Sequence, residues 1–288
     1  MSHPVYDRTA EDIGNIVEFG HINVLVPDQI LATLFYISAL GFTRDPYLLT
    51  STDNMWVNLG TDQFHLPAGN PQVVRGTAGL VMPNLEALLR RLRRYAPKLA
   101  GTQFAYAEDG DTVAVTCPWG NRMRVHAPGP RFGNLRLGMG YVEFNSPPGS
   151  SDGIARFYRQ IVGTPARVAG HEVHVGAGQT TTLIYKETDV PQPDYDGHHI
   201  QISLADFSGP HARLVARGLI TEESDQHQYR FVKLIDPDSG ETLFEVEHEV
   251  RSMRHPLYCR PLVNRNPDVT NRNFAQGHEA GMWLEWAE

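Results

Sequence analysis

Cysteine, long apolar runs and basic charge are all scarce in this sequence. Two cysteines among 288 residues, Cys117 and Cys259, are too few for a disulfide framework, which favours a reducing, cytoplasmic location. No apolar run approaches the roughly 20 residues that span a bilayer, and the first residues lack the pattern of a secretory signal. A net charge of −8 argues against a nucleic-acid partner, because such proteins neutralise phosphates with a basic surface. We therefore expect a cytoplasmic protein that binds neither membranes nor nucleic acids.

Residues 21–28 and residues 199–206 are two copies of one short strand. Each begins with His, carries apolar residues at alternate positions and ends with Asp. Because side chains alternate between the two faces of a strand, His21 shares a face with Asn23, and His199 shares a face with Gln201. The opposite, apolar face is suited to packing under helices. Each copy therefore predicts a strand with one wet face, as in the inner wall of an open barrel.

The same order of elements occurs four times along the chain. A helix and three further strands follow residues 19–28, and the pattern returns from about residues 77, 139 and 199. The helices are expected over residues 29–40, 85–95, 153–162 and 210–217. One strand–helix–three-strand unit cannot close a barrel, so the units must pair. The sequence thus predicts an α+β fold of four βαβββ units that form two open, curved barrels.

Composition predicts where the domains begin and end. Residues 1–18 are polar and predict an N-terminal arm, and the Pro- and Gly-rich residues 128–134 separate two halves. The first domain is expected over residues 19–130 and the second over residues 135–249, with two units each. Residues 250–288 lie outside the units. Their apolar end, with Trp283 and Trp286, predicts an extension that packs on the core or on a partner subunit of a homo-oligomer.

The repeated pattern resembles the vicinal oxygen chelate superfamily, which includes glyoxalase I and the extradiol ring-cleaving dioxygenases. The resemblance lies in residues 20–28, in the Phe35-Tyr36 pair and in the four units in register over about residues 19–249. The turn and strand of residues 236–245 resemble the superfamily's final strand, which delivers a carboxylate ligand, here Glu245. The resemblance implies an enzyme whose divalent metal is held by the first and last strands of paired units.

Two pairings of the units are open, and they place different residues around the metal. If units one and four pair, His21, His199 and Glu245 complete a set of two histidines and one carboxylate, with His65 as a fourth group. If units pair in sequence, as in the dioxygenases, His199 and Glu245 stand without His21. We prefer the first pairing because it gathers every good ligand in one cavity. Glyoxalase I builds its site in a similar way, across halves that exchange units. Units two and three then form a metal-free pair.

Three further residues are candidates for the chemistry. His227, as a group that titrates near neutral pH, and His198 are candidates for moving protons. The extradiol pattern has a Tyr where this sequence has Lys233, which puts ring cleavage in doubt. Tyr229 is the candidate to replace that Tyr.

The leading hypothesis is a metal-dependent dioxygenase that acts on a small, oxygen-bearing, aromatic substrate. Fe(II) is the expected metal, with Mn(II), Zn(II) and Ni(II) as alternatives. A glyoxalase-type lyase or isomerase is the second hypothesis, although no glutathione-binding motif is legible. A metal-free protein that binds a small molecule is the third.

Overall fold

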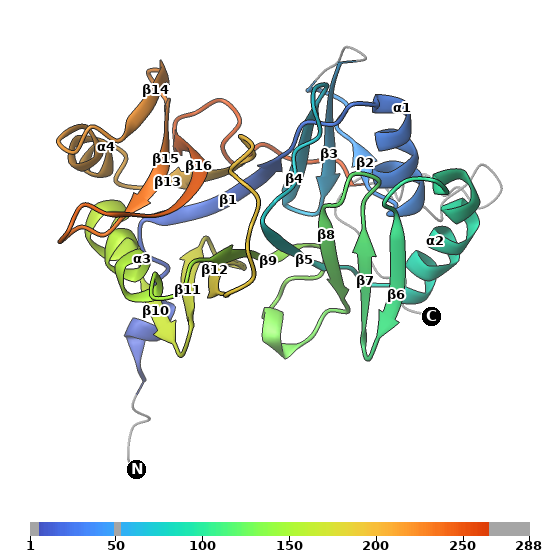
Figure 1. The fold of residues 1–288 in the computed structure, drawn as a ribbon, viewed down its shortest axis with the longest axis horizontal. Coiled ribbons are helices and arrows are strands. Elements are labelled where there is room, and N and C mark those ends of the chain that lie inside the picture. Colours follow the sequence, from blue (N-terminus) through green and yellow to red (C-terminus); the bar gives the residue numbers. More distant parts are fainter. Residues whose placement is uncertain (1–5, 49–52, 265–288) are drawn as a thin grey trace.

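The strands form two eight-stranded sheets, and each sheet combines two of the repeated units (Figure 1). The computed structural model describes residues 6–48 and 53–264. The first sheet, here the 1+4 sheet, has the order β14-β15-β16-β13-β1-β4-β3-β2. Its strands are β1 (Ile16–Asn23), β2 (Thr43–Arg44), β3 (Asn54–Leu59), β4 (Asp62–Pro67), β13 (His199–Leu204), β14 (Ile220–Asp225), β15 (Gln228–Ile235) and β16 (Thr242–Ser252).

The second sheet, here the 2+3 sheet, repeats this arrangement with the order β10-β11-β12-β9-β5-β8-β7-β6. Its strands are β5 (Gly76–Val81), β6 (Ala105–Asp109), β7 (Thr112–Thr116), β8 (Arg122–His126), β9 (Gly138–Ser146), β10 (Ala166–Ala169), β11 (Glu172–Ala177) and β12 (Thr181–Glu187). In each sheet the first strands of the two units run antiparallel side by side, β1 with β13 and β5 with β9. The predicted α+β fold of four βαβββ units is confirmed, with sheets that are curved but open.

The pairing of unit one with unit four is the one we preferred from the sequence, and the sheets confirm it. The division between the sheets is therefore not the expected division between residues 19–130 and 135–249. Each sheet takes one unit from either half, and β8 and β9, which flank residues 128–134, lie in the same sheet. The composition of a loop could not reveal this, because strand pairing is decided by contacts that are distant in sequence.

The helices of the first two units begin shortly after the repeated strands end, because a capping residue follows each of these strands. Asp28 accepts hydrogen bonds from the backbone N–H groups of Ile30 and Leu31, and Asn84 accepts one from Ala87. Gly41 follows the first helical stretch with a φ of +86°, a conformation that glycine adopts without strain. The helical elements are η1 (Arg8–Glu11), α1 (Gln29–Ala32), η2 (Thr33–Ala39), α2 (Leu85–Leu99), η3 (Pro130–Phe132), α3 (Ser151–Phe157), η4 (Tyr158–Val162) and α4 (Ser208–Val215). None of the described helices is long and apolar enough to span a membrane.

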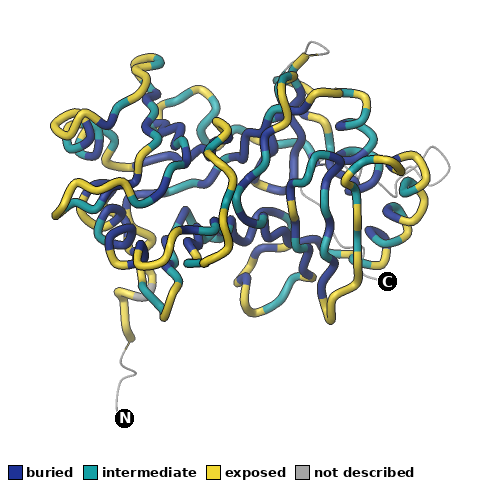
Figure 2. Tube along the Cα trace, in the orientation of Figure 1, coloured by how far each residue is buried: buried dark blue, intermediate teal, exposed yellow. Residues whose placement is uncertain are grey.

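The sheets separate an apolar face, which packs under the helices, from a polar face. In β1 and β13, Ile22, Ile200 and Ile202 belong to the main hydrophobic core and are at most 1% exposed. The residues that alternate with them, which include His21 and His199, are also buried although they are polar. Figure 2 shows this as buried strands through the middle of the molecule and exposed loops at its edges. Burial of so many polar groups on one face marks it as a site.

The ends of the fold differ from the expected boundaries by a few residues. The first strand begins at Ile16, so the arm is shorter than residues 1–18, and the last strand continues to Ser252. The described part of the C-terminal extension packs on the 1+4 sheet. Arg260 forms an ion pair with Asp45 at 2.6 Å, and the Asn264 side chain hydrogen-bonds both backbone groups of Gly60. The expected packing of Trp283 and Trp286 lies outside the described residues.

Candidate metal centre

Three histidines from three adjacent strands converge on the polar face of the 1+4 sheet. His199 on β13 and His65 on β4 both lie opposite Asn23 of the central strand β1, and His21 precedes Asn23 by two residues on the same face. One nitrogen from each histidine lies within 4.8 Å of the others. Among the described residues, this is the one group of at least three His, Cys, Asp or Glu side chains placed to hold a metal ion.

Burial favours the neutral form of two of these imidazoles, His21 and His65. His21 is 1% exposed, and burial lowers its pKa well below the usual value. Burial, together with the neighbouring His199, lowers the pKa of His65 to about 3. A neutral imidazole offers the lone pair that a metal needs. The Nε2 atom of His21 is buried without a hydrogen-bond partner, which is costly unless a ligand satisfies it. The donor set therefore fits a divalent metal of the Fe, Mn, Ni or Zn type.

Neighbouring side chains fix the orientation of His65. Its Nε2 atom lies 2.7 Å from the side-chain oxygen of Asn54. Since an amide oxygen can only accept, Nε2 carries the proton and the lone pair is on Nδ1. Trp56 stacks on the same ring with centroids 3.8 Å apart, and it meets the His21 ring in a T-shaped contact with centroids 4.9 Å apart. The tautomer and the ring plane are thus both held by residues of β3.

The carboxylate nearest to the histidines is Glu249. One of its oxygens lies 3.3 Å from Nε2 of His199, and its side chain also forms ion pairs with Arg230 and Arg251, each at 2.6 Å. Burial alone would raise the pKa of Glu249, but the hydrogen bond from His199 and the charge of Arg251 hold it well below its usual value. Glu247 lies beside the other nitrogen of His199, at 3.3 Å. The site is therefore a histidine cluster with two carboxylates at one side.

The expected carboxylate, Glu245, is not part of this cluster. It lies opposite Lys233 and lines a cavity with Arg75 and the loop of residues 188–194. Glu249 is four residues further along β16, about 13 Å at the usual rise per residue. Both residues are on the same face, as alternate positions of a strand must be. The sequence shows three alternating glutamates, and only the register of β16 against β13 selects among them.

The three candidate catalytic residues lie apart from the histidine cluster. Tyr229 belongs to the main core and packs on Phe207, so it faces the helix side of the sheet, whereas its neighbour Arg230 faces Glu249. His227 is in the turn between β14 and β15. His198 precedes β13; its Nδ1 atom lies 2.6 Å from Asp196, and its ring lies beside Tyr195. For Tyr229 the geometry contradicts a role in the cluster, because consecutive strand residues point to opposite faces. Roles for His227 and His198 stay predictions.

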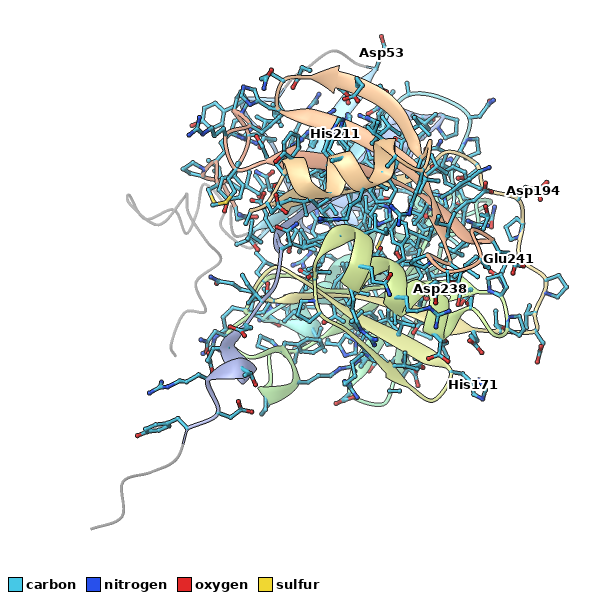
Figure 3. All side chains as sticks on the ribbon, turned by 90° about the vertical axis from the view of Figure 1, so that its left-hand side faces the viewer. Asp53, His171, Asp194, His211, Asp238 and Glu241 are labelled. Carbon is cyan, nitrogen blue, oxygen red and sulfur yellow. The ribbon has the colours of Figure 1, made fainter. Side chains whose placement is uncertain are left out.

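Two further histidines, His171 and His211, lie away from the cluster (Figure 3). Each is paired with a carboxylate, His171 with Glu187 and His211 with Glu223. Sequence reasoning missed Glu249, Arg230 and Asn54. Each of the three lies on a strand, so an alternating pattern could have identified it as a candidate. The pattern could not have shown which residues it contacts.

Comparisons with known proteins find similarity in structure and none in sequence. No family model and no curated protein matches the chain. A Bacillus subtilis protein provisionally named a dioxygenase aligns with a TM-score of 0.55 and 16% identity, over 84% of this chain and 86% of that one. Glyoxalase I from Zea mays aligns with a TM-score of 0.50 and 13% identity, over 81% and 92%. The chain therefore shares its fold with these two structures.

Likeness at these identities shows a shared fold and not a shared reaction. Both structures cover most of this chain, so the likeness extends over all four units. The reaction has to be argued from the histidine cluster and its surroundings.

Proposed function

We propose that this protein is a metal-dependent enzyme that acts on a small, oxygen-bearing substrate, and that its reaction is an extradiol-type dioxygenation of an aromatic diol. The observation that carries the proposal is the buried group of His21, His65 and His199 with nitrogens within 4.8 Å. Buried imidazoles whose nitrogens lack hydrogen-bond partners, as Nε2 of His21 and of His199 do, are expensive without a function. The three histidines lie on one polar face and come from two different units, which supports a ligand set rather than a structural cluster.

His21, His65 and His199 would hold the metal, with Glu249 as the adjacent carboxylate. When bound, the metal supplies Lewis-acid polarisation of the substrate oxygens and, as iron, a redox contact for O2. Arg230 and Arg251 are the cations that face this carboxylate. They can also orient an anionic substrate oxygen, since guanidinium groups donate several hydrogen bonds in one plane. Trp56 provides an aromatic wall beside His65 and His21.

The ion pairs of Glu249 favour the dioxygenase over the isomerase. Glyoxalase-type chemistry needs a carboxylate that accepts a proton from carbon, and a carboxylate bound by two arginines at 2.6 Å is a poor base. Ring cleavage by O2 needs no such carboxylate base. The glyoxalase-type isomerase remains the second candidate, because glyoxalase I is also expected to build its site across halves that exchange units, as the 1+4 pairing does here.

Oxygen uptake separates the candidate functions. The protein is loaded with Fe(II) without oxygen and then mixed with catechol in air-saturated buffer. We expect catechol-dependent oxygen consumption, reduced at least about 100-fold in His199→Ala and in Glu249→Gln. His211→Ala, a surface histidine, and Glu245→Gln, a carboxylate outside the cluster, are the matched controls and should retain activity.

Two outcomes would contradict the proposal. Turnover of the methylglyoxal–glutathione adduct without oxygen uptake would establish the isomerase instead. Tight binding of a small molecule with neither reaction would favour the third hypothesis, a protein that binds a small molecule without catalysis.

A further inference from the structure

The 2+3 sheet has a cavity of its own, and none of its lining residues belongs to the histidine cluster. Its volume is about 690 Å³, large enough for a small organic molecule. The walls come from β5, β8, β9 and the loop that contains η3. Its lining includes Thr77, Arg124, His126, Arg131, Phe132 and Tyr141.

Strand register shows that this cavity is the counterpart of the metal centre. In the 1+4 sheet, His65 and His199 both lie opposite Asn23. In the 2+3 sheet, Arg124 and Tyr141 both lie opposite Gly79, which takes the place of Asn23. Thr77, two residues before Gly79, then corresponds to His21.

The chemistry at these matched positions is inverted. Imidazoles donate lone pairs to a metal, whereas a guanidinium, a phenol and a hydroxyl donate hydrogen bonds. A cavity built from such donors is suited to an anion and not to a cation. The change also creates aromatic surface, because the absence of a side chain at Gly79 leaves room for the Tyr141 ring, which a Cβ there would meet at 2.1 Å.

Arg131 is the cation that is available to a ligand. Within the described residues it has no ion-pair partner, whereas Arg124 is bound to Asp109 at 2.5 Å and Lys186 to Glu172 at 3.4 Å. The Arg131 guanidinium lies 5.3 Å from the centre of the Phe132 ring and 5.2 Å from that of Tyr141. Contact with two aromatic rings positions the charge without neutralising it.

The remaining groups limit the charge and shape of the ligand. The Tyr141 hydroxyl lies 3.0 Å from Nε2 of His126, and burial raises the pKa of Tyr141, so the phenol keeps its proton. Asp111 and Glu143 also line the cavity. These two carboxylates disfavour a ligand with several negative charges.

We propose that this cavity binds a small aromatic carboxylate, with the carboxylate on Arg131 and the ring against Phe132 and Tyr141. One negative charge matches the single unpaired cation, and a planar ring matches the aromatic walls. The site is separate from the metal centre and does not depend on the proposed reaction there.

Titration calorimetry with benzoate tests this site on the full-length protein. We expect benzoate to bind the wild type with a Kd of about 1 mM or below, and Arg131→Gln to weaken binding about tenfold or more. Arg94→Gln, an exposed arginine on α2, is the matched control and should bind as the wild type does. Benzylamine, with the same ring and the opposite charge, should not bind. His199→Ala should bind benzoate normally, which distinguishes this cavity from the metal centre.

Four results would overturn the proposal. The first three are equal benzoate affinity in the wild type and Arg131→Gln, binding of benzylamine as tight as that of benzoate, and no benzoate binding by the wild type at about 10 mM. Inorganic phosphate bound as tightly as benzoate would also contradict it, because the aromatic walls would then contribute nothing.

Discussion

Asn54 lies outside the proposed ligand set and orients one of its members, His65. Its side-chain oxygen accepts the proton of His65 Nε2 and so leaves the Nδ1 lone pair available. We expect Asn54→Ala to lower metal affinity about 10- to 100-fold, because His65 can then rotate and exchange tautomers. Competition with a chromogenic chelator measures this affinity directly. Asn145→Ala, which removes an amide that binds Gln192 elsewhere, should leave the affinity unchanged. Equal affinities for all three proteins would contradict the orienting role.

Arg260 is one of the residues by which the C-terminal extension is held to the sheet. Its partner Asp45 is 3% exposed, and without Arg260 that carboxylate would be buried and unpaired. We expect Arg260→Met to lower the free energy of unfolding by about 2 kcal/mol or more. Denaturation by urea measures the change, and Asp45→Asn combined with Arg260→Met should recover part of the loss. A single variant as stable as the wild type would show that the extension is not held in this way.

The residue scale also shows where sequence reasoning stops. His21, His65 and His199 were all predictable, because matched positions in a repeat and a wet strand face are local patterns. Glu249 was not, because Glu245, Glu247 and Glu249 alternate identically along one strand. Choosing among them requires the offset between β16 and β13, which is set by tertiary packing and not by the pattern itself.

At the scale of elements, the turn between β3 and β4 joins the two sheets. Asp62 at this turn accepts a hydrogen bond of 2.6 Å from the backbone N–H of Met139 on β9. Asp62 is 2% exposed, and burial raises its pKa to about 8. The side chain is therefore protonated in the folded protein at neutral pH, although it ionises near pH 4 when the chain is unfolded.

The raised pKa of Asp62 makes the contact between the two sheets sensitive to pH. Since the folded state holds the proton more tightly, the stabilising contribution of Asp62 is complete below about pH 4 and is lost as the pH rises to about 8. We expect Asp62→Asn, which keeps an acceptor for Met139, to gain on the wild type by up to about 1.4 kcal/mol per pH unit over this window. Urea denaturation at several pH values measures both proteins. A constant difference between them would mean that Asp62 is ionised in the fold.

The order of elements in each unit could be predicted from the sequence, because it depends on local signals. Asp28 and Asn84 cap helices at the ends of matched strands, and Gly41 ends the first helical stretch. Strand lengths were less accurate. The first strand starts at Ile16, because burial of Ile16 in the core, and not the polarity of the arm, decides where pairing begins.

At the scale of the whole molecule, the fold is an exchange of units between halves. The sequence predicted four units but left both pairings open, because each unit carries the same apolar face and can cover any other. The candidate ligands favoured the 1+4 pairing, whereas the loop at residues 128–134 favoured a sequential division. The histidine pattern was the better guide to the pairing that the sheets show.

Cutting the chain between its halves tests this exchange. In a fragment of residues 1–128, β1 lacks β13 and β5 lacks β9, so both central strands have an open edge. We expect the fragment to lack a cooperative thermal transition by circular dichroism, and to regain one when mixed with a fragment of residues 129–288. A first half that folds stably by itself would contradict the observed pairing.

The central claim is that histidines from units one and four share one metal, and the amount of bound metal tests it most directly. The wild type and the variants His21→Ala, His65→Ala, His199→Ala and His211→Ala are purified without chelators, loaded with Fe(II) or Zn(II), and analysed for metal by mass spectrometry. We predict about one metal per chain in the wild type and in His211→Ala, and a large loss in the other three. Full metal content in His21→Ala with loss in His199→Ala would place the site within unit four alone. A wild type that takes up no metal would contradict the account.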